Sequence, residues 1–381
     1  MGNTSGYLII FAVATVTTGV MTPIVRLFAR RRGWVAEPGG RKIHTTPTAE
    51  VGGIAMFAGV AVALFVAWRM DRFSAYFDGN SETLGVLIAA AIILIVGVVD
   101  DVRELSAPAR IVGTIVAGLV LVFYGVTMFY FRIPFLDVFQ ISNDWIPIIT
   151  VLWLLVMTQA INLIDGLDGL AAGIVAIASG AFFIYSQHLG DLELLAEPNI
   201  GPLIAIITVG VCVGFLPFNF NPASIFMGDG GAYLLGFLLA VSTSVVGGRA
   251  DPATQRFSGQ TYFFLAPLFI PLIILGVPIF DVIFAVVRRV GRGRGFATAD
   301  KGHLHHRLIN LGHGPRRAVI ILWAWTFLLS AFVLYPVFNP RANSIAAFGI
   351  FAIVLFLYTV LHPDLRRGSN VSMNSDDGAS V

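Results

Sequence analysis

Apolar runs about as long as a membrane-spanning helix recur along the whole of this 381-residue chain. A helix needs roughly 20 consecutive apolar residues to cross the hydrocarbon core of a bilayer. Backbone polar groups in lipid must be satisfied within the segment itself, so these runs predict an all-α polytopic bundle of about eleven transmembrane helices. The runs are 7–29, 51–69, 83–99, 110–128, 145–163, 169–187, 200–217, 231–248, 261–287, 317–338 and 343–361.

The composition excludes an ordinary soluble domain. Only 12% of the residues are charged and 57% are hydrophobic, whereas soluble domains average about 25% charged residues. The single Cys212 excludes a disulfide framework. We therefore expect residues 1–365 to form one integral-membrane domain, followed by a disordered cytoplasmic tail at 366–381.

The basic residues predict how the chain is oriented. No Lys or Arg precedes the first run, and "RLFARRR" closes it. With the N-terminus outside and the C-terminus in the cytoplasm, 18 of the 24 Lys and Arg residues lie in cytoplasmic segments. Because cytoplasmic loops carry an excess of Lys and Arg, this bias favours that topology. We expect a multi-pass protein of the plasma or inner membrane.

In this topology, unusual polar residues from four separate loops fall on the cytoplasmic face. Their convergence predicts an active site at the boundary between membrane and cytoplasm. The residues are Asp100, Asp101, Asn162, Asp165, Asp168, Asn219, Asn221, Asp229, His303, His305 and His306.

Two of the motifs carry closely spaced acids. Asp100 and Asp101 end an apolar run, and adjacent carboxylates repel unless a cation or a shared proton neutralises them. A metal or proton-transfer role and a solvated helix end account for this pair equally well. In "NLIDGLDGLAAG", Asn162, Asp165 and Asp168 are three residues apart, which predicts one shared helical face. The alternative is a turn between two spans, which accounts well for one Asp-Gly pair but less well for two such pairs in succession.

A third motif, "FNFNPASIFMGDGGAYLLGF", places Asp229 among glycines at the start of a span. Backbone amides at a helix N-terminus attract phosphate, so this glycine-rich start predicts a diphosphate site. A carboxylate there repels phosphate unless a cation bridges them, and Mg²⁺ is the hard ion that suits both. Taken alone, an N-capping role for Asp229 is the plainer interpretation.

Two basic loops complete the predicted site. The loop "RGRGFATADKGHLHHRLINLGHG" has no nearby Cys that would indicate zinc, so His303, His305 and His306 are better suited to binding an anion. Contact with anionic lipid heads would explain its Arg and Lys residues but not the clustered His. In "GGRKIHTTPTAEVGGIAM", Lys42 and His44 are candidate substrate-binding residues.

Together these motifs resemble the polyprenyl-phosphate N-acetylhexosamine-1-phosphate transferases, the integral-membrane group called glycosyltransferase family 4. The resemblance covers about 37–315 and is carried by "RKIHTTPTAEVGGIA", the Asp100–Asp101 pair, "NLIDGLDGLAAG", "NFNPASIFMGDGGAYLLGF" and "ADKGHLHHRL". It implies a Mg²⁺-dependent enzyme, with Mn²⁺ as a substitute. A UDP-sugar gives its sugar 1-phosphate to a polyprenyl phosphate in the membrane and UMP leaves. No nucleic acid is involved, and relatives suggest a homodimer.

The resemblance also implies roles for individual residues. Asp100 is the base or phosphate-orienting group for the lipid phosphate, with Asp101 beside it, and Asp165 belongs to the same catalytic cluster. By the same resemblance, Asp229 and Asn162 bind the metal, and Asp168 and Phe226 contact the uracil. Arg110 binds the diphosphate, and Asn219 and Asn221 bind the substrate. The three histidines bind the sugar phosphate.

Three alternatives remain at this point. Transfer of phospho-N-acetylmuramoyl-pentapeptide is the nearest, but that branch typically has three consecutive His. This chain has "HLHH", like the branch that transfers N-acetylglucosamine 1-phosphate from UDP-N-acetylglucosamine. An ion-coupled transporter would place its acids near the membrane midplane, often in two related halves. A structural scaffold needs none of the clustered acids.

Overall fold

The computed structural model describes residues 4–36, 47–132, 138–193, 195, 198–247, 308, 313–339 and 345–360. Within these ranges the chain is mostly helical, as the apolar runs predicted. The helices are α1 (Thr4–Arg32), α2 (Gly53–Trp68), η1 (Asp71–Tyr76), α3 (Glu82–Arg103), α4 (Ala107–Phe123), α5 (Ile146–Ile164), α6 (Leu170–Asp191), α7 (Gly201–Asn219), α8 (Gly228–Gly247), α13 (Pro315–Phe338) and α14 (Ile345–Val360).

Seven of the described helices are long and apolar enough to cross a membrane. Helices α2, α4 and α14 are as apolar but shorter, at 16, 17 and 16 residues. Ten of the predicted runs coincide with described α helices, and the run at 261–287 lies outside the described residues. Large apolar side chains such as Phe123, Phe327 and Phe351 are exposed on the flanks, as a surface facing lipid requires.

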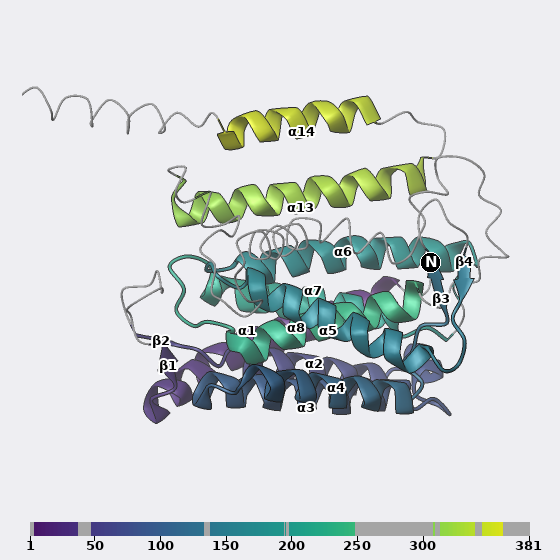
Figure 1. Cartoon of the computed structure of the whole chain (residues 1–381), viewed down its shortest axis with the longest axis horizontal. Coiled ribbons are helices and arrows are strands. Elements are labelled where there is room, and N and C mark those ends of the chain that lie inside the picture. Colours follow the sequence, from purple (N-terminus) through teal and green to yellow (C-terminus); the bar gives the residue numbers. More distant parts are fainter. Residues whose placement is uncertain are drawn as a thin grey trace, which may run out of the picture.

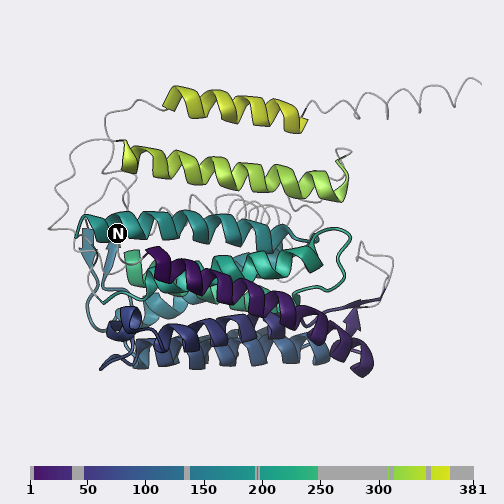
Figure 2. The same cartoon turned by 180° about the vertical axis from the view of Figure 1, so that it is seen from behind.

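The helices lie side by side, and α8 is at their centre (Figures 1 and 2). Helix α8 packs against α2, α3, α5, α6 and α7. Close packing of α3 on α8 depends on Gly97, because a Cβ at this position would overlap the backbone of Gly230. Small residues that let backbones approach in this way are the usual basis of helix association in membranes.

Two small antiparallel hairpins are additions that the all-α prediction missed. Strands β1 (Val35–Ala36) and β2 (Thr48–Ala49) pair at one end of the bundle, and β3 (Tyr130–Arg132) and β4 (Val138–Gln140) pair at the other. The first described residues of α1 lie at the β3–β4 end (Figure 1). Helix α4 ends at Phe123, before the end of the run predicted at 110–128, and the chain then continues toward β3.

The segments that bear the predicted site residues meet at the β1–β2 end. Ala49 of β2 forms a parallel bridge with Ile225, in the connection between α7 and α8. Three further backbone bonds continue this pairing: Phe226 N–H to Ala49 O at 2.8 Å, Gly52 N–H to Phe226 O at 3.0 Å and Gly53 N–H to Met227 O at 2.9 Å. The pairing holds the start of α2 against the segment that leads into α8.

Candidate active site

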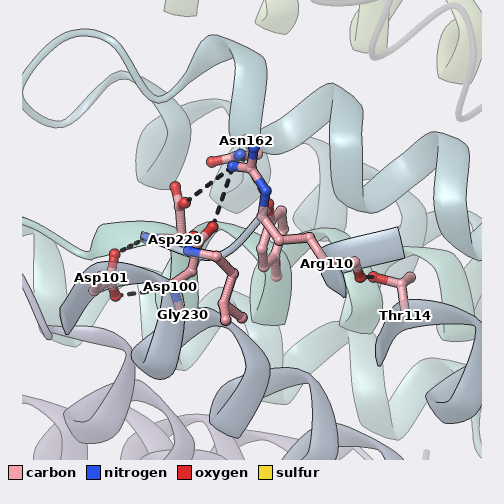
Figure 3. A network of polar contacts seen from close by, with 9 residues as sticks. Asp100, Asp101, Arg110, Thr114, Asn162, Asp229 and Gly230 are labelled. Atoms are coloured by element: carbon pink, nitrogen blue, oxygen red, sulfur yellow. Dashed lines mark hydrogen bonds and ion pairs between the residues drawn. The ribbon is translucent and has the colours of Figure 1, made fainter. Parts of the chain in front are cut away.

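The C-terminal turn of α3 presents Asp100 to the first turn of α4. Asp100 is buried, and its Oδ1 accepts a hydrogen bond of 2.7 Å from the Leu105 backbone N–H. Arg110 donates from Nη1 to Asp100 Oδ2 at 3.1 Å (Figure 3). The chain reverses between α3 and α4 at Glu104, whose φ of 48° is left-handed, and this reversal brings Arg110 back over Asp100.

The same guanidinium faces a second carboxylate from a distant part of the chain. Arg110 Nη1 lies 3.8 Å from Asp229 Oδ2, in the first turn of α8. The side chains of Arg110 and Asp229 are each 32% exposed, so the site is open on one side, whereas that of Asp100 is 4% exposed. Asp100 and Asp229 therefore share one cation at the open end of the bundle.

Asp101 points toward α8 instead of toward Arg110. Its Oδ1 accepts from the Asp229 backbone N–H at 2.6 Å, and its Oδ2 accepts from the Gly230 N–H at 3.2 Å (Figure 3). The Gly231 N–H is bonded to the Met227 carbonyl at 3.2 Å. In this structure an internal carboxylate therefore occupies the two amides on which the sequence predicted a diphosphate.

The connection between α5 and α6 also differs from the prediction. Asn162, Asp165 and Asp168 do not share a helical face, because α5 ends at Ile164 and Asp165 has a non-helical ψ of 56°. Asn162 remains on the helix and donates to the Tyr233 hydroxyl at 3.3 Å. The next helix begins only after Gly169, whose φ of 77° is left-handed. The Asp-Gly repeat thus forms a turn.

Asp168 and two asparagines hold this turn to the connection between α7 and α8. Asp168 Oδ2 accepts from Asn221 Nδ2 at 2.9 Å and from the Ala223 N–H at 3.0 Å. Asn219 is buried, and its side-chain amide forms two hydrogen bonds with the backbone. It accepts from the Gly169 N–H at 3.1 Å and donates to the Ile225 carbonyl at 3.1 Å. These contacts support the segment that carries Phe226 and Asp229.

One acid near the site was not predicted from the sequence. Glu50 follows β2, and its carbonyl lies so close to Gly228 that a side chain at 228 would overlap it. Burial, together with the nearby carboxylates of Asp229, Glu50 and Asp168, raises the pKa of the Asp165 carboxyl to about 8. The signal in the sequence was an acid directly before "VGG", at the same face as the other acids. Lys42, His44, His303, His305 and His306 lie outside the described residues.

The carboxylates fit a divalent cation that also binds substrate oxygens. Among the described residues, no three His, Cys, Asp or Glu side chains are grouped so as to hold a metal ion by themselves. Asp100 and Asp229 already share a positive group, the Arg110 guanidinium. Proteins usually bind Mg²⁺ through one or two carboxylates together with substrate phosphates, and the partly exposed Asp229 carboxylate fits that kind of site.

The chain is similar to known proteins over most of its length. Residues 83–247 match the model of glycosyl transferase family 4. The chain is 36% identical to decaprenyl-phosphate N-acetylglucosaminephosphotransferase of Mycobacterium tuberculosis, over 94% of this chain and 89% of that protein. It is 32% identical to a probable undecaprenyl-phosphate N-acetylglucosaminyl 1-phosphate transferase of Bacillus subtilis (92% and 90%) and 28% identical to phospho-N-acetylmuramoyl-pentapeptide-transferase of the same species (83% and 93%). The chain, with its acids gathered at one end of an apolar helix bundle, belongs to glycosyl transferase family 4.

Proposed function

We propose that this protein transfers N-acetylglucosamine 1-phosphate from UDP-N-acetylglucosamine to a polyprenyl phosphate in the membrane. An oxygen of the lipid phosphate forms a bond to the β-phosphorus of the donor. The bond from that phosphorus to the oxygen bridging the two phosphates breaks, and UMP leaves. The products are a sugar–pyrophosphate–lipid and UMP, and this step begins the assembly of a cell-envelope glycan.

One observation carries this proposal: Asp100 and Asp229, from α3 and α8, meet at a single guanidinium at the open end of an apolar bundle. Phosphoryl transfer requires little from a protein beyond positioning and charge stabilisation. Acids and a basic group at the end of membrane helices lie where a soluble diphosphate and a lipid phosphate can both reach them. Relatives at 36% and 32% identity are named as transferases to decaprenyl and undecaprenyl phosphate.

Each of these groups has a task in the proposed reaction. Asp229 and Asn162 would hold Mg²⁺, and the cation would supply charge that neutralises the donor diphosphate. Arg110 moves from the two carboxylates onto the diphosphate, since phosphate oxygens accept hydrogen bonds in the same geometry as carboxylates. Asp100 is then free to orient the lipid phosphate and to hold its proton.

The donor and acceptor are tested together in one assay. Membranes containing the protein are incubated with undecaprenyl or decaprenyl phosphate and a panel of UDP-sugars, and the lipid product and UMP are identified by mass spectrometry. We expect UDP-N-acetylglucosamine to give product and UMP. Product from UDP-N-acetylmuramoyl-pentapeptide alone would assign the protein to the branch of its 28% identical relative. Transport of the sugar without UMP release would refute a transferase.

The nucleotide side of the site is proposed to include Phe226. It is half-buried, and its backbone is held between Ala49 and Gly52. Stacking of a base on an aromatic ring is worth about 1–3 kcal/mol, so Phe226→Ala should raise KM for the UDP-sugar roughly 5- to 150-fold and leave KM for the lipid unchanged. Phe226→Leu keeps apolar bulk and should lose nearly as much. Unchanged donor KM in both variants would remove Phe226 from the site.

The proposed orientation places the site end of the bundle in the cytoplasm. The loop at Asn80, between η1 and α3, then lies outside the cell, and Asn370 lies inside. A Cys212→Ser background removes the buried native thiol, and Asn80→Cys and Asn370→Cys are labelled in intact cells with a reagent that does not cross membranes. We expect labelling at 80 alone. Labelling at 370 in intact cells would place the C-terminal tail outside and contradict the proposed orientation.

Cation binding should release a proton from Asp165. Its pKa of about 8 means that this carboxyl is mostly protonated at pH 7, and a nearby divalent cation favours the charged form. Calorimetry of Mg²⁺–UDP binding in buffers of different ionisation enthalpy should show proton release at pH 7 that declines as the pH rises above about 8. Asp165→Asn should abolish most of this release, whereas Asp144→Asn, an exposed acid before α5, should not change it. Equal release from all three proteins would exclude Asp165.

A further inference from the structure

The N-terminus of α8 is capped by a side chain from another helix. The first N–H groups of any α helix have no partner inside it, and a side chain directly preceding the helix usually accepts their hydrogen bonds. Here the acceptor is Asp101 of α3, which binds the N–H of Asp229 at 2.6 Å and that of Gly230 at 3.2 Å. One carboxylate thus fixes two consecutive amides of a helix 128 positions further along the chain.

The surrounding backbone is shaped to admit this carboxylate. Gly228 has a φ of 68°, and a Cβ at this position would overlap the Asp101 carboxyl group. Gly97, one turn before Asp101, brings the α3 backbone against Gly230. Two glycines therefore clear the space in which Asp101 reaches α8, and the contact is part of how the two helices pack.

The neighbouring acid has a different set of partners. Asp100 accepts from the Leu105 N–H and from Arg110, and so faces the site, whereas Asp101 accepts from α8 (Figure 3). The two adjacent carboxylates are not interchangeable. Asp101 binds the backbone of the very residue, Asp229, whose side chain stands 3.8 Å from Arg110.

We propose that Asp101 is a positioning residue, which acts by holding the first turn of α8 so that the Asp229 carboxylate points into the site. It touches neither substrate nor cation, in contrast to the catalytic role expected from its place beside Asp100. This inference rests on the proposed function only for the task of Asp229. The cap itself consists of hydrogen bonds to two backbone amides, so it can be tested without any substrate.

Hydrogen exchange of the purified protein in detergent tests the cap. Asp101→Ala removes both acceptors, so the Asp229 and Gly230 amides should exchange roughly tenfold faster or more, followed by mass spectrometry on peptides spanning 225–232. Asp101→Asn keeps one acceptor oxygen and the size of the side chain, and should fall between. Asp100→Asn is the matched control and should leave these amides unchanged. Wild-type exchange at both amides in Asp101→Ala would overturn the proposal.

Turnover measurements test whether the cap acts through Asp229. In Asp101→Asn we expect the Mg²⁺ concentration for half-maximal UMP release to rise, excess Mg²⁺ to restore most of the turnover, and KM for the lipid to stay unchanged. Asp101→Ala should be restored less. Loss of turnover in Asp101→Asn that no Mg²⁺ concentration restores would mean direct participation, and would overturn the positioning role. If the wild-type protein makes no lipid-linked sugar, the proposed function fails, while the exchange result still decides the cap.

Discussion

Asp229→Asn should lower UMP release by about 10³-fold, equivalent to about 4 kcal/mol of lost transition-state stabilisation. The substitution keeps the size of the side chain and removes its charge. The backbone N–H of residue 229 still bonds to Asp101, so the helix should start in the same place and the protein should insert and fold normally. In the proposed mechanism the bound cation then loses its anionic ligand, and the diphosphate loses the cation that neutralises its charge. Steady-state UMP release, together with binding of UDP in the presence and absence of Mg²⁺, measures both consequences.

Asp100→Asn is the matched comparison for this prediction. It should be similarly inactive but should still bind UDP with Mg²⁺, because the proposed partner of Asp100 is the lipid phosphate. The structure argues against a capping role for Asp229, since Asp101 already binds the first amides of α8. Near-normal turnover in Asp229→Asn would refute the assignment of this residue to the metal.

Arg110→Ala should lower kcat/KM for the UDP-sugar by about 10²–10³-fold, the usual cost of removing one group that stabilises developing charge. The variant also leaves Asp100 and Asp229 facing each other without their shared cation, so the affinity of the site for Mg²⁺ alone should rise. Arg110→Lys keeps the charge but not the fork of donors, and should recover only part of the activity. Kinetics with varied donor and titration of Mg²⁺ separate the two effects.

An arginine close by in the chain controls for simple loss of positive charge. Arg103 is exposed in the last turn of α3, and Arg103→Ala should change kcat/KM little. Equal losses of kcat/KM in Arg103→Ala and Arg110→Ala would mean that both arginines act only through the overall positive electrostatic field at this end of the bundle. Unchanged donor kinetics in Arg110→Ala would remove it from the diphosphate site.

Much of the architecture could be predicted because lipid imposes so strong a constraint. A run such as 145–163 has no alternative to a helix in a membrane, and α5 spans Ile146–Ile164. The gathering of acids at one end also followed, because alternate spans return the chain to the same side. That Asp100 and Asp229 lie at the same end of the bundle could be predicted in this way without knowledge of any contact between them.

Short polar connections were predicted less well. The spacing of Asn162, Asp165 and Asp168 fits a helical face as well as it fits a turn. The turn forms because Asn219 supplies an acceptor for the Gly169 N–H and Asp168 accepts from Asn221 and Ala223. Those partners lie about 50 residues away in the chain, and local spacing carries no information about them.

By itself the sequence determined the class of protein, the helical runs and the end of the bundle at which the acids gather, because each depends on hydrophobicity, charge and length. Only the tertiary structure decided which partner each acid binds. Asp100 and Asp101 are adjacent and identical in chemistry, yet one faces Arg110 and the other caps α8. Successive side chains on a helix point about 100° apart, so their partners depend on which helices pack on each side, and that packing is a property of the whole bundle.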